Sequence, residues 1–231
     1  MADFGKFEEK IGYAFANKRL LKQAFTHRSY INEHRESGLS HNERLEFLGD
    51  AVLELVITRY LFDRYPDATE GELTSYRAAL VNTNTLSDTA RNLGAEEFLL
   101  LSKGEARDTG RARAYILADT YESIVGALYL DGGYDAAHDF IENTLFHKTE
   151  EMVKKGLWRD AKSLFQERAQ EKLGITPVYR VVSESGPDHD KEFVTAVYLK
   201  DEKVAEDSGK SKQESEQRAA SLALRAKGWE A

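Results

Sequence analysis

Three carboxylates lie within two helical turns of one apolar stretch, NERLEFLGDAVLELVIT, which runs from Asn42 to Thr58. On a helix with 3.6 residues per turn and Glu43 set at zero, Glu46 falls at about 300° and Asp50 at about 340°, so the acids share one face. The stretch is either an ordinary amphipathic helix with a charged outer face or half of a site for hard divalent cations, which prefer oxygen ligands. The apolar residues predicted on the opposite, inward side are Leu45, Leu48, Val52, Leu55 and Val56.

A second acidic pair lies in the stretch AYILADTYESIVGALYLDGGY, from Ala114 to Tyr134. Asp119 and Glu122 are three residues apart and therefore share a helix face. Two apolar helices with acidic faces in one domain predict a shared metal site. Mg²⁺ is the expected ion, with Mn²⁺ as a substitute, because there is no His or Cys cluster that would favour zinc. The residues predicted on the other side of this helix are Leu117, Tyr121, Ile124 and Leu128.

Residues 1–156, which would position these acids, are predicted to form a domain whose regular elements are all helices. Phe4 to Ala24 has helical spacing with a break at Gly12 to Asn17. Asn42 is the predicted N-cap of the first acidic helix, which Pro66 ends at about Tyr65. The core candidates of the N-terminal segment are Phe7, Ile11, Leu20, Leu21 and Ala24.

Further helices are predicted after Pro66. Thr69 and Glu72 have the spacing of a capping box, and Thr85–Leu93 continues the helical pattern. Gly132–Gly133 is predicted to stop the second acidic helix, and Tyr134 to about Lys155 forms the last helix of the domain. The residues that the helix after Thr69 is expected to turn inward are Leu73, Tyr76, Leu80 and Val81.

Three arginines, Arg107, Arg111 and Arg113, precede the second acidic helix. They are read either as members of a solvated loop or as contacts to phosphate groups.

A second domain is predicted at residues 161–231, after a short linker at 157–160. A helical segment, three stretches of alternating apolar and polar residues and a second helical segment indicate an α-β-β-β-α order. Ser211 and Glu214 have capping-box spacing, which would surround an exposed helix N-terminus with Gly209, Lys210 and Lys212. Backbone amides, the helix dipole and two ammonium groups in one place predict a phosphate-binding turn.

Composition limits the class of protein. The chain has 231 residues, 41% of them hydrophobic and 31% charged, which is typical of globular domains. The absence of cysteine excludes a disulfide scaffold, thiolate zinc and thiol catalysis. No signal-peptide or membrane-spanning stretch is found, so a soluble cytoplasmic protein is expected. The net charge of −8 argues mildly against a nucleic-acid partner, although metal-binding acids contribute to it and only the local charge matters.

Two motifs carry a family resemblance. HNERLEFLGDAV resembles the signature stretch of ribonuclease III, and LADTYESIVGALYLDGG resembles the second acidic block of the same catalytic domain. The small domain resembles a double-stranded-RNA-binding domain in LFQERAQ, in GPDH followed by KEF, and in GKSKQESEQRAA. The resemblance covers nearly the whole chain. It implies an all-α endonuclease domain followed by a small α+β double-stranded-RNA-binding domain.

The resemblance also implies roles for individual residues. Glu46, Asp50, Asp119 and Glu122 match the family's metal-coordinating carboxylates, with Asp50 and Glu122 as the catalytic pair. Glu43 matches an acid at the edge of the site that faces RNA and the dimer partner, and Glu70 falls where a further acid supports the metal site. The positions that match RNA contacts are Gln166, Glu167 and Gln170 in the first helix, His189 in a loop, and Lys210, Ser211 and Lys212 in the phosphate-binding turn.

Two positions depart from the family pattern. Gln213 follows Lys212 where many relatives have a second lysine, and Asp188 places a negative charge beside His189. Both predict weaker or more salt-sensitive RNA binding by the small domain alone.

The implied activity is cleavage of double-stranded RNA by two-metal phosphodiester hydrolysis, which leaves 5′-phosphates and 3′-hydroxyls. The resemblance adds a homodimer through the catalytic domain, short 3′ overhangs, and ribosomal RNA precursors as substrates. The sequence leaves two other functions open. One is a non-catalytic protein that binds duplex RNA or associates with the ribosome, and the other is an unrelated metal phosphohydrolase.

Overall fold

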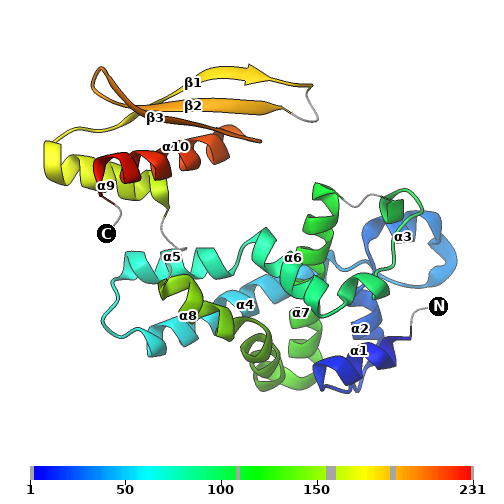
Figure 1. Ribbon diagram of the computed structural model, residues 1–231. Coiled ribbons are helices and arrows are strands. Elements are labelled where there is room, and N and C mark those ends of the chain that lie inside the picture. The colour runs from blue at the N-terminus through cyan, green and yellow to red at the C-terminus, as the bar shows by residue number, and fades with distance from the viewer. Residues whose placement is uncertain (1–2, 108–109, 155–159, 188–190, 230–231) are drawn as a thin grey trace. The chain divides into compact units, whose positions relative to one another are not determined.

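A computed structural model describes residues 3–107, 110–154, 160–187 and 191–229 (Figure 1). The chain divides into two compact units, Met1–Trp158 and Arg159–Ala231. The first unit is helical and the second combines helices with a sheet. Each unit has its own buried core.

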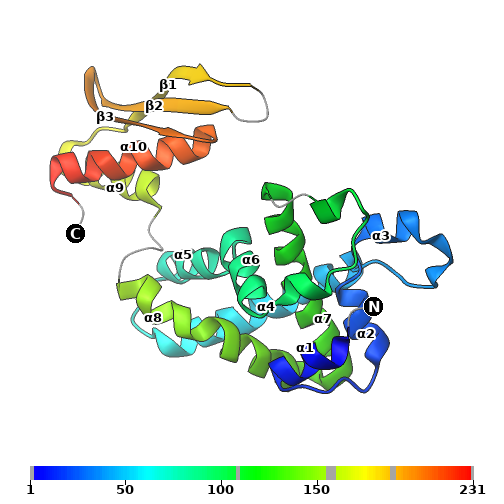
Figure 2. The ribbon, with the colours of Figure 1, turned by 45° about the vertical axis from the view of Figure 1, so that its right-hand side comes forward.

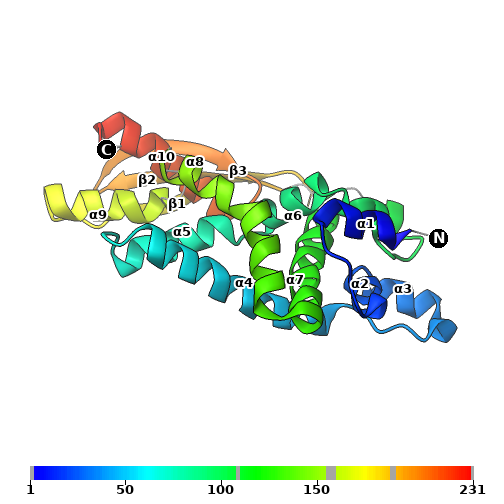
Figure 3. The ribbon, with the colours of Figure 1, turned by 90° about the horizontal axis from the view of Figure 1, so that it is seen from below.

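Two long helices, α4 and α7, form the centre of the first unit, where they cross and pack against one another (Figure 2). α5 packs along α4, and α6 and α2 pack on α7 (Figure 3). The α-helices of this unit are α1 (Phe4–Ile11), α2 (Lys18–Ala24), α3 (Arg28–Glu33), α4 (Glu43–Arg64), α5 (Glu70–Leu80), α6 (Thr83–Asn92), α7 (Arg111–Ile141) and α8 (His147–Lys154). The shorter helical turns are η1 (Arg35–Ser37), η2 (Ala95–Phe98), η3 (Glu105–Arg107) and the π-helix η4 (Glu142–Phe146).

The core of this unit contains most of the residues that the sequence pattern assigned to it. Phe7 and Phe25 are fully buried and meet edge to face, with ring centroids 4.9 Å apart. The inward prediction was wrong for Leu55, which is 58% exposed. No other element of this unit covers that side of α4 in the described chain, since Phe47 and Phe62 are 80% and 67% exposed there. An ideal helical wheel cannot show which faces have a neighbour.

The start of α4 also differs from expectation. Asn42 precedes the helix, but its side chain makes no capping hydrogen bond. Its φ and ψ angles of −83° and −15° are already helical, and the buried amide group donates to the carbonyl oxygen of Ala24 at 3.3 Å. The backbone amide of Asn42 donates to the carbonyl oxygen of Thr26 at 2.9 Å. Asn42 therefore ties the first acidic helix to the end of α2.

The capping box at α5 is confirmed, because the Thr69 hydroxyl accepts from the Glu72 amide and the Glu72 carboxylate accepts from the Thr69 amide. The predicted stop at Gly132–Gly133 is confirmed, because Gly133 has the non-helical angles φ 77° and ψ −166° and divides α7 into two helical segments that meet at a kink. Because glycine tolerates positive φ at little cost, the chain can turn sharply there before the second segment continues to Ile141.

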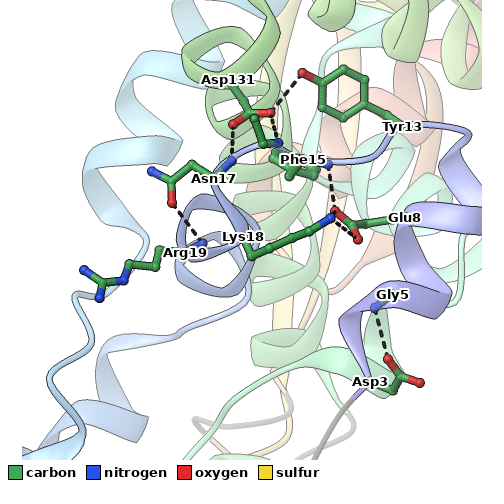
Figure 4. A network of polar contacts seen from close by, with 10 residues as sticks. Asp3, Gly5, Glu8, Tyr13, Phe15, Asn17, Lys18, Arg19 and Asp131 are labelled. Atoms are coloured by element: carbon green, nitrogen blue, oxygen red, sulfur yellow. Dashed lines mark hydrogen bonds and ion pairs between the residues drawn. The ribbon is translucent and has the colours of Figure 1, made fainter.

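A network around Asp131 fixes the segment between α1 and α2 (Figure 4). The Asp131 carboxylate accepts hydrogen bonds from the Tyr13 hydroxyl at 3.0 Å and from the Ala16 and Asn17 amides at 2.8 Å each. Burial alone would raise the pKa of Asp131, but these hydrogen bonds outweigh it and hold the pKa below its ordinary value. Gly132 leaves room for this arrangement, since a Cβ there would collide with the Tyr13 hydroxyl.

The second unit is a three-stranded antiparallel sheet in the order β1-β2-β3, with α10 packed on β2 and β3 and α9 packed against α10. This confirms the α-β-β-β-α prediction. Phe165, Val197 and Ala219 are fully buried between the helices and the sheet. The elements are α9 (Ala161–Leu173), β1 (Val178–Ser185), β2 (Glu192–Leu199), β3 (Glu202–Gly209) and α10 (Lys212–Lys227).

Within the described residues, every helix is too short or too polar to traverse a bilayer.

Candidate functional site

The crossing of α4 and α7 brings together carboxylates that are far apart in the sequence. One carboxylate oxygen each of Glu46, Asp119 and Glu122 lies within 4.8 Å of the others. All three side chains are half-buried. These three residues, which we call the acidic cluster, come from both motifs that the sequence singled out.

Two glycines allow the helices to approach this closely. A Cβ at Gly49 would overlap the carbonyl oxygen of Glu122, and a Cβ at Gly126 would overlap the carbonyl oxygen of Leu45. Gly49 stands between Glu46 and Asp50, and Gly126 stands about one turn after Glu122. The motifs and helical spacing in the sequence did not single out these glycines. Their signal was a pair of residues that weaken a helix, each placed in the middle of a well-formed one.

Mutual repulsion and burial make the acidic cluster hard to ionise. Burial, followed by the charges of Asp50, Asp119 and Glu46, raises the pKa of Glu122 to about 8. Burial and the neighbouring acids also raise the pKa of Glu46, and burial and Glu43 raise that of Asp119. Shifts of this kind are common where a site is built to hold a cation.

Asp50 adjoins the acidic cluster but is more exposed than its three members. Its charge is the largest electrostatic contribution to the raised pKa of Glu122, and it also raises the pKa of Glu46. Asp50 therefore lies close enough to influence both carboxylates.

These four carboxylates are suitable ligands for a divalent cation. Their oxygens are hard ligands of the type that Mg²⁺ and Mn²⁺ prefer. A bound cation would remove the repulsion that raises their pKa values.

The two supporting acids differ in position. Glu43 lies at the edge of the acidic cluster, where its carboxylate pairs with Arg28 at 3.3 Å and lies 3.7 Å from His41, and its charge acts on Glu46 and Asp119. In the described chain the cluster does not extend to Glu70. Glu70 is the exposed first residue of α5 and accepts a hydrogen bond from Thr74 at 3.2 Å.

The three α9 residues expected to contact RNA are all exposed. Gln166, Glu167 and Gln170 line a shallow open groove, while Phe165 and Ala169 on the opposite side are fully buried. These three side chains are therefore open to solvent.

The turn before α10 has the predicted capping geometry. The Ser211 hydroxyl accepts from the Glu214 amide at 3.1 Å, and the Glu214 carboxylate accepts from the Lys210 amide at 2.8 Å. Lys210 and Lys212 are exposed, with the Lys212 ammonium 5.7 Å from the Phe193 ring centroid. Glu214 also pairs with Arg218, which reduces its negative charge beside the turn.

Four further positions that the sequence singled out need separate comment. Asp188 and His189 lie outside the described residues. Neither reading proposed for Arg113 was correct, because its side chain is 6% exposed. It donates to the carbonyl oxygen of Glu105 at 2.9 Å and lies 3.7 Å from Glu96, so it anchors the segment before α7. Arg107 is exposed at the end of η3.

Comparisons with known proteins agree with these two units. A family model described as "Ribonuclease-III-like" matches residues 17–149, and one described as "Double-stranded RNA binding motif" matches residues 161–227. The chain is 47% identical over 223 residues to "Ribonuclease 3" of Geobacillus kaustophilus, covering 96% of this chain and 90% of the relative. It is 44% identical over 221 residues to "Ribonuclease 3" of Oleidesulfovibrio alaskensis, covering 96% of each chain.

Among solved structures, the helical unit is similar to the nuclease domain of ribonuclease III from Campylobacter jejuni. One such structure is 37% identical, covers 64% of this chain and 97% of its own, and has a TM-score of 0.57. A second has a TM-score of 0.55 and is 38% identical, with 62% of this chain and 98% of its own covered. Its description refers to a flexible region involved in dimer formation in that protein.

Proposed function

The chain belongs to the ribonuclease III family, and we propose that it cleaves double-stranded RNA by two-metal phosphodiester hydrolysis. The observation that carries this proposal is the acidic cluster, in which Glu46 of α4 meets Asp119 and Glu122 of α7. A protein that only bound RNA would have no use for half-buried carboxylates whose repulsion must be overcome.

Glu46, Asp50, Asp119 and Glu122 would hold Mg²⁺, or Mn²⁺ in its place. Bound divalent ions would supply an activated water and neutralise the negative charge that gathers on the phosphate. Asp50 and Glu122 would be the catalytic pair. Glu43, held by Arg28, would border the entrance for RNA, and Glu70 would support the site from outside the acidic cluster. The expected products carry 5′-phosphate and 3′-hydroxyl ends.

The small unit would hold the duplex. A-form RNA presents 2′-hydroxyls in a shallow minor groove, which amide side chains such as those of Gln166 and Gln170 can reach together with Glu167. Lys210, Ser211 and Lys212 would contact phosphates at the start of α10. The Double-stranded RNA binding motif match over this unit supports the assignment. His189 stays a proposed contact from the sequence pattern.

We extend the proposal to a homodimer formed through the helical unit. Phe47, Leu55 and Phe62 form an exposed apolar row along α4. Large apolar side chains gathered on one helix face mark an interaction surface, and a symmetric dimer covers the same surface on both copies. Each subunit would then cut one strand and leave short 3′ overhangs.

The substrates would be structured transcripts in the cytoplasm, with ribosomal RNA precursors among them. Recognition by groove shape and phosphate position favours long, regular duplexes over a particular base sequence.

The test is cleavage of a long duplex RNA by the parent and by Glu122→Gln, each with Mg²⁺ and with EDTA. We expect the parent to cleave only with Mg²⁺ and the variant to lose at least about 100-fold in kcat, because one ligand of the metal centre is lost. Duplex binding in EDTA should stay within about twofold of the parent, since Glu122 lies in a different unit from the RNA-contacting residues.

Glu97→Gln, at an exposed residue of η2, is the matched control for the catalytic rate. Comparable turnover by Glu122→Gln would overturn the assignment of the acidic cluster. Duplex binding without cleavage by the parent would favour the non-catalytic RNA-binding protein. Activity on small phosphoesters that survives deletion of residues 161–231 would favour an unrelated phosphohydrolase.

A further inference from the structure

Arg77 of α5 and Glu54 of α4 form an ion pair beside the acidic cluster. Nε of Arg77 lies 2.9 Å from Oε2 of Glu54, and Nη1 donates to the Thr58 hydroxyl at 2.8 Å. The Arg77 and Glu54 side chains are 33% and 40% exposed. Two contacts to α4 therefore hold the guanidinium group in one orientation.

Glu54 continues the acidic face of α4. It follows Asp50 by four residues, which places it about one turn, or roughly 6 Å, farther along the same side of the helix. Its charge reaches across to α7, where it contributes to the raised pKa of Glu122. Glu54 is thus a further carboxylate next to Glu46, Asp50, Asp119 and Glu122, in addition to Glu43, which pairs with Arg28.

The role of the Arg77–Glu54 pair follows from the balance between the carboxylate charges and the charges of the bound cations. Four carboxylates balance two divalent cations, whereas a further unpaired carboxylate would leave a negative charge where RNA phosphates must enter. Arg77 comes from a different helix, α5, and it meets the carboxylate that is in excess. Glu54 is also long enough to compete for a cation if it were released.

We infer that Arg77 is a positioning residue of the metal centre, which acts by holding Glu54 away from the four carboxylates and cancelling its charge. The inference rests on the proposed function. The alternative is that the ion pair is a brace, which only stabilises the packing of α5 on α4. The positioning role predicts that substitutions of Arg77 and Glu54 shift Mn²⁺ affinity in opposite directions, whereas a brace does not.

The test compares Arg77→Met, Glu54→Gln and the double variant in the full-length protein. Mn²⁺ binding without RNA is followed by the electron paramagnetic resonance signal of free Mn²⁺, and duplex RNA affinity is measured in EDTA. Arg77→Met should bind Mn²⁺ about fourfold more tightly and RNA about twofold more weakly, because it frees one negative charge beside the acidic cluster. Glu54→Gln should shift both affinities in the opposite direction.

The double variant restores the charge and should return both affinities to within about twofold of the parent. Asp88→Asn and Arg91→Met, which break an exposed ion pair within α6, are the matched controls and should change neither. Equal losses of thermal stability in both single variants, with Mn²⁺ affinity unchanged or shifted in the same direction, would overturn the inference in favour of a brace. If Glu122→Gln bound Mn²⁺ as tightly as the parent, the proposed metal centre itself would fail, and the inference with it.

Discussion

The acidic cluster between α4 and α7 is held by tertiary packing, whereas the candidate RNA contacts of the small unit are held by hydrogen bonds between residues close in the sequence. Glu46 and Glu122 meet only because two helices cross at Gly49 and Gly126. The turn at Ser211 is instead closed by a capping bond within four residues. The acidic cluster brings together negative charges that repel one another. The turn at Ser211 instead exposes positive charges that would attract RNA phosphates.

This difference predicts how each region responds to change. A site that depends on a close helix crossing should be disrupted by a single added methyl group at the crossing. The repulsion between its carboxylates should lower the stability of the metal-free protein. A site built on an exposed turn should lose binding in proportion to the charge removed, with the fold intact.

The largest effect is expected from Gly49→Ala. The new methyl group overlaps the carbonyl oxygen of Glu122, so the helices must separate. A shift of about 1 Å in reacting groups costs roughly 100-fold in rate, and overpacking costs about 1–3 kcal/mol in stability. Duplex cleavage and thermal unfolding measure these quantities.

Gly71→Ala is the matched control for that variant, because a Cβ at Gly71 of α5 meets open space. Gly126→Ala tests the same crossing from the other helix. If Gly49→Ala and Gly126→Ala both cleaved at the parental rate, the crossing would not be what positions the carboxylates.

A smaller effect is expected from the double change Lys210→Ala and Lys212→Ala. Losing two phosphate contacts should weaken duplex binding by about 10-fold at moderate salt and lower the slope of log K against log salt by about 2. The rate at saturating RNA should be unchanged. Lys203→Ala, at a lysine paired with Glu206 in β3, is the control. A lower cleavage rate at saturating RNA with unchanged duplex affinity would contradict the assignment of catalysis to the acidic cluster and of RNA binding to the turn before α10.

The smallest effect concerns stability and pH. Glu122 has a pKa of about 8 in the folded protein against 4.5 ordinarily, so the folded state binds more protons than the unfolded state between these values. The free energy of unfolding without metal should therefore fall as pH rises from about 4.5 to 8. Because the side chain is partly exposed, we expect a contribution of only about 1 kcal/mol.

Urea unfolding in EDTA across that pH range tests this point. Glu122→Gln cannot ionise at this position and should show a flatter profile, with greater stability than the parent at pH 8. An identical pH dependence in the two proteins would show that the acidic cluster carries no electrostatic strain.

Much of the fold followed from local patterns in the chain. The helical spacing of residues 4–24, the capping box at Thr69 and the α-β-β-β-α order all depend on neighbours within a few residues, and the structure agrees with them. Predictions that depended on distant neighbours were less successful. Leu55 was assigned to the core, and Arg113 was placed in a solvated loop or on phosphate.

The sequence by itself determined which residues could do chemistry, because Glu46 with Asp50 and Asp119 with Glu122 each share a face through helix geometry alone. Tertiary structure decided that the two faces meet, that Gly49 and Gly126 permit the meeting, and that Arg77 pairs with Glu54. Periodicity fixes the direction of a side chain around its own helix axis. The distance between two helices depends on packing between residues that are remote in the chain, and no local pattern encodes it.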